Sequence, residues 1–399
     1  LAGIALAGLA GTALNVLAPG PDEGAGAASV AAIETSQVVV DRAGELLKPF
    51  PISEGRWRLP VSLDAVDPRF VTLLTAYEDG RFFAHQGVDP VALVRAGLQL
   101  VGNGEIVSGG STITMQLARL LTPGRARTVP TKLSQIEEAL ALERALTKRQ
   151  ILTAYLTLAP YGGNIEGLAA ASLAWFGHAP HKLTVAESAL LIALPQSPEA
   201  RRPDRDAAAA RAARDRVLQR LEAAGAIDRA ELERALREAV PEARRELPNR
   251  APHLALREIT ASPDARVVAL TLDGGLQARL EAMVAEKRAF MADRQSVAIV
   301  VADHTTGEVL AEIGSAGFFS DGRFGQIDMV RAVRSPGSAL KPFIYGLAFE
   351  AGLAHPETLI EDRPVDFGGY RPTNFELDYQ GTVTVREALQ QSLNVPAVR

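Results

Sequence analysis

The feature that most constrains the fold is a long stretch of helical pattern that runs from Pro68 to about Leu221. Ala and Leu dominate this stretch, and both are good helix formers. Turn-forming residues break the helical pattern at Pro123, at Pro130, at 160–163 and at 195–198. The sequence therefore predicts a domain built mainly from several helices.

Strand-like segments appear on both sides of this helical stretch. Residues 36–47 have the pattern of a β-hairpin with a turn near 41–44, and residues 297–302 and 308–313 have the pattern of a second hairpin. A strand at 267–272 and a helix at 276–287 mark the start of an α+β region. The predicted divisions are an anchor over 1–18, a linker and hairpin over 19–60, the helical domain over 61–225, a linker over 226–264 and the α+β domain over 265–399.

Composition excludes several classes of function. The 399 residues have a net charge of -5, whereas a DNA- or RNA-binding domain usually carries a basic excess, so no nucleic-acid partner is expected. The absence of Cys excludes disulfides and Cys-ligated metals. His178 and His181 are three residues apart, but no acidic residue lies at ligand spacing, so we assign no metal-binding residues.

Residues 1–18 contain no charged residue, and Pro19-Gly20-Pro21 ends the run. Eighteen apolar residues are at the short limit for a membrane-spanning helix. A remnant of a signal peptide and a buried helix are the alternatives, and the length favours the membrane anchor. Because the chain begins without Met, we expect it to start inside a longer apolar segment.

The segment from Tyr77 to Asp89 has the composition of an active site. Glu78 and Asp79 end an apolar helix-like run, and two phenylalanines follow. An acidic pair at a helix end is often only a solvated surface feature. Here Phe82 and Phe83 would desolvate a nearby carboxylate and raise its pKa, as a general acid or base at neutral pH requires.

A second polar segment begins with a glycine-rich turn at Gly109-Gly110 that leads to Ser111. The run 109–112 supplies an N-cap hydroxyl for the helix that follows, and Thr112, Gln116 and Arg119 share one face of that helix. A helix N-terminus with hydroxyl, amide and guanidinium groups on one face suits a diphosphate. A polar core face is the alternative, but Arg and Gln are seldom fully buried.

These two segments match an ordered pair of family motifs. Glu-Asp-x-x-Phe-x-x-His-x-Gly followed by Gly-Gly-Ser-Thr-Ile-Thr-x-Gln-Leu resembles the peptidoglycan glycosyltransferase domain of glycosyltransferase family 51, and residues 132–143 and 148–156 resemble two further family blocks. The resemblance covers about 36–225. It implies a mainly α, lysozyme-like domain that polymerises lipid II into glycan strands.

The resemblance also implies roles for individual residues. Glu78 is the general base on the acceptor sugar hydroxyl, and Asp79 orients the loop. The growing glycan is displaced at its anomeric carbon with inversion, and undecaprenyl diphosphate leaves. Mg²⁺ or Mn²⁺ assists the diphosphate. The implied substrate contacts are His85, Ser111, Thr112, Gln116, Arg119, Lys132 and Lys148.

The sequence departs from the family pattern at one catalytic position. Gln135 stands where the family has a second important Glu, which removes a charge but keeps an acceptor oxygen. Glu137 and Glu138 point to other faces of the same helix and do not replace it. We therefore expect an altered rate or metal dependence, and a weakly active or non-catalytic cell-wall scaffold is the alternative reading.

A third motif lies in the α+β region. Ser338 and Lys341 form Ser-x-x-Lys after a Pro-Gly turn, one helical turn apart, so the amine can reach the hydroxyl. Ser392 and Asn394 supply a Ser-x-Asn element. Both elements resemble the penicillin-binding transpeptidase fold, which includes class A β-lactamases. The resemblance implies that Ser338 is the nucleophile toward stem peptides and β-lactams, Lys341 its base, and Ser392 and Asn394 supporting groups.

The Lys-Thr-Gly motif of that fold does not occur before Arg399. We therefore expect an incomplete transpeptidase domain, without crosslinking or penicillin-binding competence in this 399-residue form. The two domains in this order resemble class A penicillin-binding proteins, and residues 55–61, Gln135 and 159–163 resemble the 1C type. The resemblance implies a single-pass protein of the bacterial cytoplasmic membrane that faces the periplasm and works with other cell-wall synthesis proteins. A β-lactamase-type serine hydrolase is the less favoured alternative.

Overall fold

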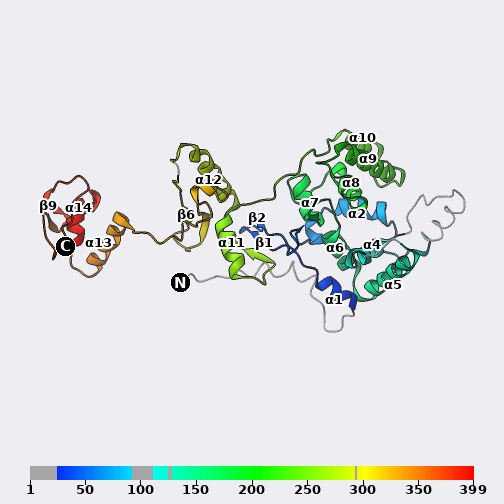
Figure 1. Cartoon of the computed structure of the whole chain (residues 1–399), viewed down its shortest axis with the longest axis horizontal. Helices are drawn as coiled ribbons and strands as arrows, with labels where there is room; N and C mark the ends of the chain where they lie inside the picture. The colour runs from blue at the N-terminus through cyan, green and yellow to red at the C-terminus, as the bar shows by residue number, and fades with distance from the viewer. Residues whose placement is uncertain (1–24, 92–110, 125–127, 293) are drawn as a thin grey trace. The chain divides into compact units, whose positions relative to one another are not determined.

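The computed structural model of the chain describes residues 25–91, 111–124, 128–292 and 294–399 (Figure 1). It divides into two compact units, one ending at Val330 and the other running from Arg331 to Arg399. The predicted anchor at 1–18 and the Gly109-Gly110 turn lie outside the described residues. Within the described ranges, no helix is long and apolar enough to cross a membrane.

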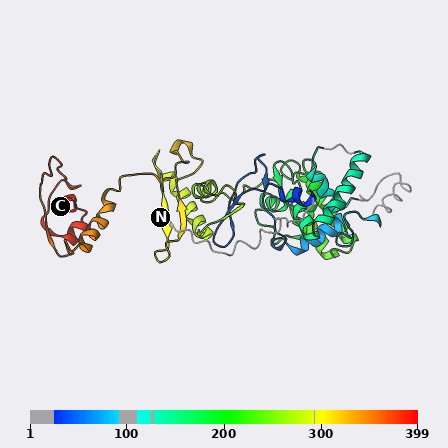
Figure 2. The ribbon, with the colours of Figure 1, turned by 90° about the horizontal axis from the view of Figure 1, so that it is seen from below.

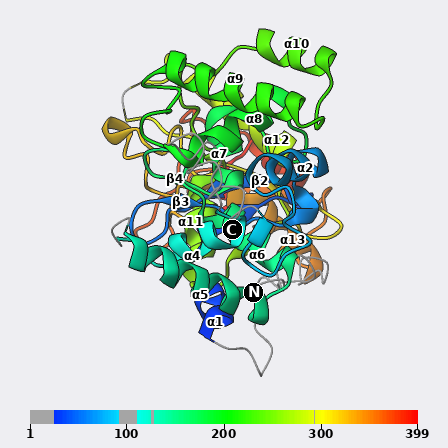
Figure 3. The same cartoon turned by 90° about the vertical axis from the view of Figure 1, so that its right-hand side faces the viewer.

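The predicted helical pattern is confirmed in the part of the chain that holds the first site. Its helices are α2 (Pro68–Glu78), α4 (Ile113–Leu121), α5 (Val129–Ala145), α6 (Lys148–Leu158), α7 (Leu168–Trp175), α8 (Val185–Ala193), α9 (Ala207–Ala223) and α10 (Arg229–Arg237). Helix α6 is buried from Ile151 to Leu158 and forms the centre of the core. Helices α4 and α5 lie on one side of the domain, and α8, α9 and α10 lie on the other (Figures 1 and 3).

Local sequence explains where these helices begin. Thr147 and Thr184 each form a capping box with the residue three positions later, and Thr128 caps α5. Pro130, which was expected to break the helical pattern, instead occupies the first turn of α5. Proline is tolerated there because the first N–H groups of a helix have no intrahelical partner.

The predicted hairpin at 36–47 is also confirmed, as β1 (Val38–Val40) antiparallel to β2 (Leu46–Pro49). Strand β5 (Val267–Ala269) pairs parallel with β1 and gives a three-stranded sheet in the order β2-β1-β5. Val39, Leu47 and Leu272 share a small core with α11 (Pro252–Ala261).

Two segments expected to be linkers contain helices. Residues 19–60 include α1 (Ala25–Ala31), an Ala-rich helix whose Val30 is buried, as is Ile33 just after it. Residues 226–264 include α10, which agrees with the helix that the sequence predicts from Asp228 to about Val240, and α11, which begins with a proline at its first position. The unexpected helices are α1 and α11, where helix propensity and an apolar face outweigh the Gly-, Ala- and Pro-rich composition of 21–35 and the mixed composition of 241–263.

The rest of the first unit follows the prediction. Helix α12 (Gly274–Lys287) precedes the antiparallel hairpin of β6 (Ile299–Ala302) and β7 (Val309–Ile313), drawn as long arrows in Figure 2. The second unit has a small core around Tyr345 and Val385. Its elements are η6 (Gly337–Leu340), α13 (Lys341–Glu350), β8 (Leu359–Asp362), β9 (Gly381–Thr384), α14 (Val385–Gln390) and α15 (Asn394–Val398).

Candidate active site

Glu78 is the last residue of α2, and two side-chain amides hold its half-buried carboxylate. Gln116 of α4 donates from Nε2 to Oε2 at 2.9 Å, and Gln196 donates from Nε2 to Oε1 at 2.8 Å. The turn η3 (Leu194–Gln196), which follows α8, carries Gln196. Glu78 and Gln116 were predicted from the sequence, but Gln196 was not. The only local signal near Gln196 is the proline break at 195–198.

Tyr155 of α6 holds the Gln116 side chain by a hydrogen bond. Its hydroxyl donates to Gln116 Oε1 at 3.4 Å. Burial, and next the charge of Glu78, raise the pKa of the Tyr155 hydroxyl well above its ordinary value. Tyr155 is therefore protonated at neutral pH and donates, which orients the Gln116 amide with its NH₂ group toward Glu78.

Asp79 ties the loop after α2 to the start of α4. Its carboxylate lies 2.9 Å from His85 Nε2 through each oxygen and accepts a hydrogen bond from the backbone N–H of Ile113 at 3.0 Å. Asp79 and His85 are both buried. The geometry agrees with a role of Asp79 in orienting the loop. It does not agree with His85 as a substrate contact, because the His85 ring is enclosed by protein.

Thr112 is likewise turned inward. Its hydroxyl donates to the Gly87 carbonyl at 2.6 Å and accepts from the backbone N–H of Met115 at 3.1 Å, and the residue is 2% exposed. The expected contact between Thr112 and a diphosphate is therefore not supported. The amides of Ile113 and Met115, in the first turn of α4, already have partners within the protein.

Ser111, Lys132 and Arg119 form the cationic end of the site. Lys132 Nζ donates to Ser111 Oγ at 2.6 Å, and burial together with the nearby Arg119 lowers the pKa of the Lys132 amine. Arg119 is exposed and makes no ion pair with the described residues. Gln135 lies one turn after Lys132 on α5 and is half-buried. This end of the site suits an anion.

Lys148 has a different role from the one expected. Its amine donates to Glu143 Oε1 at 2.6 Å and lies 4.5 Å from the centroid of the Phe82 ring. Glu143 also accepts from the Thr114 hydroxyl. Lys148 is thus neutralised within the protein, so a contact with the diphosphate is not supported. Phe83, expected to desolvate a carboxylate, is 65% exposed.

In the second unit, Lys341 meets the Ser-x-Asn element. Its amine contacts the Ser392 carbonyl, lies 3.2 Å from Ser392 Oγ and 2.6 Å from Asn394 Oδ1, and burial lowers the pKa of the amine. Ser338 is exposed on η6, and within residues 294–399 no hydrogen bond joins it to Lys341. The structure therefore brings three of these four predicted residues together.

Sequence reasoning missed the residue that holds Asn394. The side chain of Asn374 accepts from the Asn394 backbone N–H at 2.8 Å and donates to both oxygens of Asp362, at 3.1 and 2.9 Å. Asp362 is fully buried. A buried carboxylate with an amide partner thus anchors the segment that presents Asn394 to Lys341.

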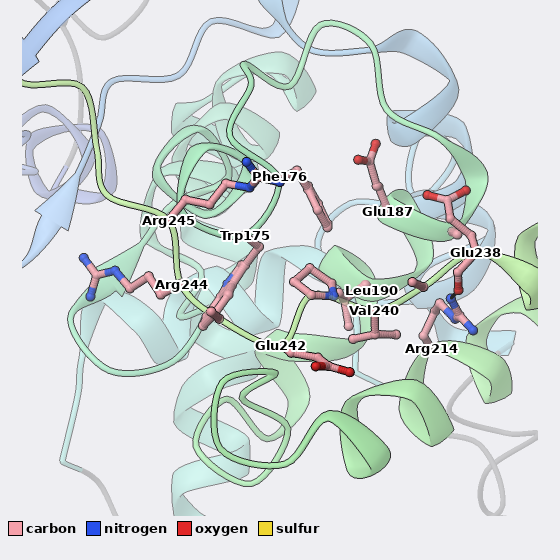
Figure 4. A pocket seen from close by; sticks show the side chains of 14 residues that line it. Trp175, Phe176, Glu187, Leu190, Arg214, Glu238, Val240, Glu242, Arg244 and Arg245 are labelled. Carbon is pink, nitrogen blue, oxygen red and sulfur yellow. Dashed lines mark hydrogen bonds between the residues drawn. The ribbon is translucent and has the colours of Figure 1, made fainter. Parts of the chain in front are cut away.

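A separate hollow of about 470 Å³ lies on the first unit between α7, α8, α9 and residues 238–245 (Figure 4). Trp175 and Phe176 line it together with Arg214, Arg244 and Arg245. None of the residues predicted from the sequence lines this hollow. Across the described ranges, no group of three or more His, Cys, Asp and Glu side chains is placed to hold a metal ion.

Two family models match the chain, one over each of the regions that hold these residues. Residues 43–222 match the transglycosylase family model, and residues 297–399 match the model of the penicillin-binding protein transpeptidase domain. Glu78 lies within the first match, and Lys341 and Asn394 lie within the second.

Three curated relatives are penicillin-binding proteins. The chain is 43% identical to penicillin-binding protein 1C of Escherichia coli over 92% of this chain and 47% of that protein. It is 29% identical to penicillin-binding protein 1F of Bacillus subtilis over 92% of this chain and 53% of that protein. It is 31% identical to penicillin-binding protein 1B of Vibrio cholerae over 86% of this chain and 47% of that protein.

The chain thus spans about half the length of the curated relatives it matches. The family resemblance predicted from the motifs is confirmed by the order of the two matches. With a transglycosylase domain followed by transpeptidase sequence, the chain belongs to the class A penicillin-binding proteins.

Proposed function

We propose that this chain is a peptidoglycan glycosyltransferase that polymerises lipid II into glycan strands and is coupled to a serine transpeptidase that crosslinks stem peptides. The observation that carries the first activity is the half-buried Glu78 carboxylate, held by Gln116 and Gln196. The family match over 43–222 supports this proposal.

In the proposed reaction, Glu78 accepts the proton of the acceptor sugar hydroxyl as its oxygen attacks the anomeric carbon of the growing glycan. A C–O bond forms with inversion, and the bond from the anomeric carbon to the undecaprenyl diphosphate oxygen breaks. The electron pair leaves with the diphosphate. Lys132 and Arg119 supply positive charge for this leaving group, and Ser111 supplies a hydroxyl beside Lys132.

Few of the described side chains at this end of the site could act as ligands of a divalent cation. The groups here are two cations, the Ser111 hydroxyl and the Gln135 amide, whereas Mg²⁺ usually uses one or two carboxylates together with the phosphates. These residues do not fit a protein-bound metal, so no step is derived through one. Mg²⁺ or Mn²⁺ remains part of the proposal only as an ion brought by the diphosphate.

For the transpeptidase of the full-length protein we propose that Ser338 attacks the D-Ala-D-Ala carbonyl of a stem peptide, or a β-lactam, and forms an ester while the leaving amine takes a proton. The depressed pKa of the Lys341 amine favours a neutral form that can accept the Ser338 proton. Ser392 and Asn394 lie against that amine. We further propose a single-pass anchor in the bacterial cytoplasmic membrane, catalytic domains facing the periplasm and contacts with other cell-wall synthesis proteins.

Polymerisation of a lipid-linked disaccharide–peptide precursor tests the first activity. We expect the wild type to form glycan chains and Glu78→Gln to form none while it keeps the melting temperature of the wild type. Glu242→Gln, which changes an exposed carboxylate at the separate hollow, is the matched control and should stay active. A wild type with no more product than Glu78→Gln would support the non-catalytic scaffold instead.

A further inference from the structure

Gln196 is itself held by a second residue. Its Oε1 accepts a hydrogen bond from Arg201 Nη1 at 3.0 Å, and the same nitrogen donates to the Ala193 carbonyl at 2.6 Å. Because Gln196 Nε2 bonds Glu78 Oε1 at 2.8 Å, the three side chains form a continuous series from Arg201 through Gln196 to Glu78.

The series fixes which end of the Gln196 amide faces Glu78. An amide oxygen only accepts hydrogen bonds, and an amide nitrogen only donates them. The Arg201 guanidinium only donates, so it selects the amide orientation in which the oxygen faces Arg201 and the NH₂ group faces the carboxylate. Without Arg201, the amide could rotate and place its oxygen against Glu78, which would repel the carboxylate.

The exposure of Gln196 argues against a purely structural role. Gln196 is exposed at the end of the turn η3, between Pro195 and Pro198. A solvent-exposed hydrogen bond contributes little to folding stability, because water replaces either partner. Yet both ends of this amide are bonded, and one bond ends on the carboxylate to which we assign the proton transfer.

We propose that Gln196 and Arg201 are positioning residues of the glycosyltransferase reaction. Gln196 holds the Glu78 carboxylate in one orientation toward the acceptor hydroxyl, and Arg201 acts through Gln196 by fixing its amide. This inference rests on the proposed function. It assigns to a Pro-rich turn 118 residues after Glu78 a part in catalysis that no local motif indicated.

Steady-state polymerisation kinetics with the lipid-linked precursor test the proposal. Gln196→Glu keeps the shape of the side chain but replaces the donor with a second carboxylate oxygen. Gln196→Met removes both polar ends. We expect kcat to fall by about tenfold or more in each variant, within the range that general-base catalysis contributes. We expect KM and the melting temperature to stay close to those of the wild type.

A double-mutant cycle tests whether Arg201 acts through Gln196. Arg201→Met should lower kcat in the wild-type background and have little further effect when combined with Gln196→Met. Arg201→Lys, which keeps a donor and the charge, should recover part of the rate. The matched control is Arg205→Gln, four residues after Arg201, whose side chain is exposed and pairs with Glu199 at 3.3 Å.

The outcomes separate this inference from the proposed function. A kcat of Gln196→Glu equal to that of the wild type, or fully additive effects of Arg201→Met and Gln196→Met, would overturn the positioning role. In either case an active wild type and an inactive Glu78→Gln would leave the proposed function standing. A wild type that forms no glycan overturns both.

Discussion

At the scale of single residues, Lys132 is the position where activity and stability are expected to oppose each other. Burial and Arg119 lower the pKa of its amine, so the charged form is less favourable in the folded protein than in the unfolded chain. Lys132 therefore reduces stability at neutral pH. This cost fades as the pH rises from the lowered pKa of the folded protein to above the ordinary lysine pKa of 10.5, where the amine is neutral in both states.

We accordingly expect Lys132→Met to lose polymerisation activity while its melting temperature at pH 7 equals or exceeds that of the wild type. The difference in melting temperature should shrink as the pH is raised toward 10. Thermal unfolding at several pH values, together with the polymerisation assay, measures both effects. An active variant with a lower melting temperature would show that Lys132 stabilises the fold and leaves the diphosphate to other residues.

At Gln135 we expect a substitution that keeps or raises activity, in contrast to Lys132→Met. It lies one turn from Lys132 and forms no hydrogen bond with its side chain among the described residues. A carboxylate there would have Lys132 one helical turn away as a partner, so Gln135→Glu should fold normally and keep or raise the polymerisation rate. Its dependence on Mg²⁺ should also change, as measured with and without EDTA. If this variant were as inactive as Glu78→Gln, the expectation would be wrong.

At the scale of elements, Gly87 fixes how the catalytic loop meets α5. Its φ is +85°, and a Cβ atom would lie 2.8 Å from the Ala139 carbonyl oxygen and 3.0 Å from Glu143 Cγ. Gly44 has the same φ of +85° but nothing within 4 Å. The two glycines therefore share the backbone strain of a substitution and differ only in the space available.

We expect Gly44→Ala to lower the free energy of unfolding by about 1–2 kcal/mol, the strain of a left-handed residue. Gly87→Ala should lower the free energy of unfolding by more than this, because the backbone of α5 must also move. It should reduce polymerisation as well, since the Gly87 carbonyl accepts a hydrogen bond from the Thr112 hydroxyl at 2.6 Å. Denaturant unfolding of both variants measures the difference. Equal losses in the free energy of unfolding would mean that α5 shifts to make room for the extra methyl group with little loss of stability.

The elements also show what sequence reasoning can and cannot reach. The hairpin at 36–47 and the helix at 276–287 were predicted because their signals are local. The parallel pair of β3 (Trp57–Arg58) and β4 (Ile165–Glu166) was not predicted, because two-residue strands carry no periodicity. Gln196 was missed for a related reason: its bond to Glu78 depends on how α8 packs against α2, not on its neighbours in sequence.

At the scale of the whole molecule, the first unit is held together by contacts between distant parts of the chain. Val38 pairs with Val267 in the sheet, and Gln37 Nε2 donates to the carbonyls of Pro263 and Ala265 at 2.8 and 2.9 Å. Asp41 Oδ2 accepts from the backbone N–H of Gly274 at 3.1 Å. The hairpin at the beginning of the unit is therefore completed by residues beyond 260.

This pairing predicts how the chain responds to shortening. A chain that ends at Val330 keeps β5 and Leu272 and should polymerise the lipid-linked precursor with the wild-type dependence on Glu78. A chain that ends at residue 264, at the predicted start of the α+β domain, loses the parallel partner of β1 and leaves Val39 and Leu47 without Leu272. Burying apolar surface contributes about 25 cal/mol per Å², so the shorter chain should melt at a lower temperature.

Thermal unfolding of the two shortened chains, followed by the polymerisation assay on each, measures this effect. A third chain, which ends at Val330 and carries Val39→Ala, isolates the small core shared by β1, β2 and α11. It should fall between the other two, because it loses two methyl groups from the sheet but keeps the strand pairing. Equal melting temperatures for the chains ending at 264 and at 330 would show that the helical domain is stable without β5, and that a boundary near 265 separates independently folding parts.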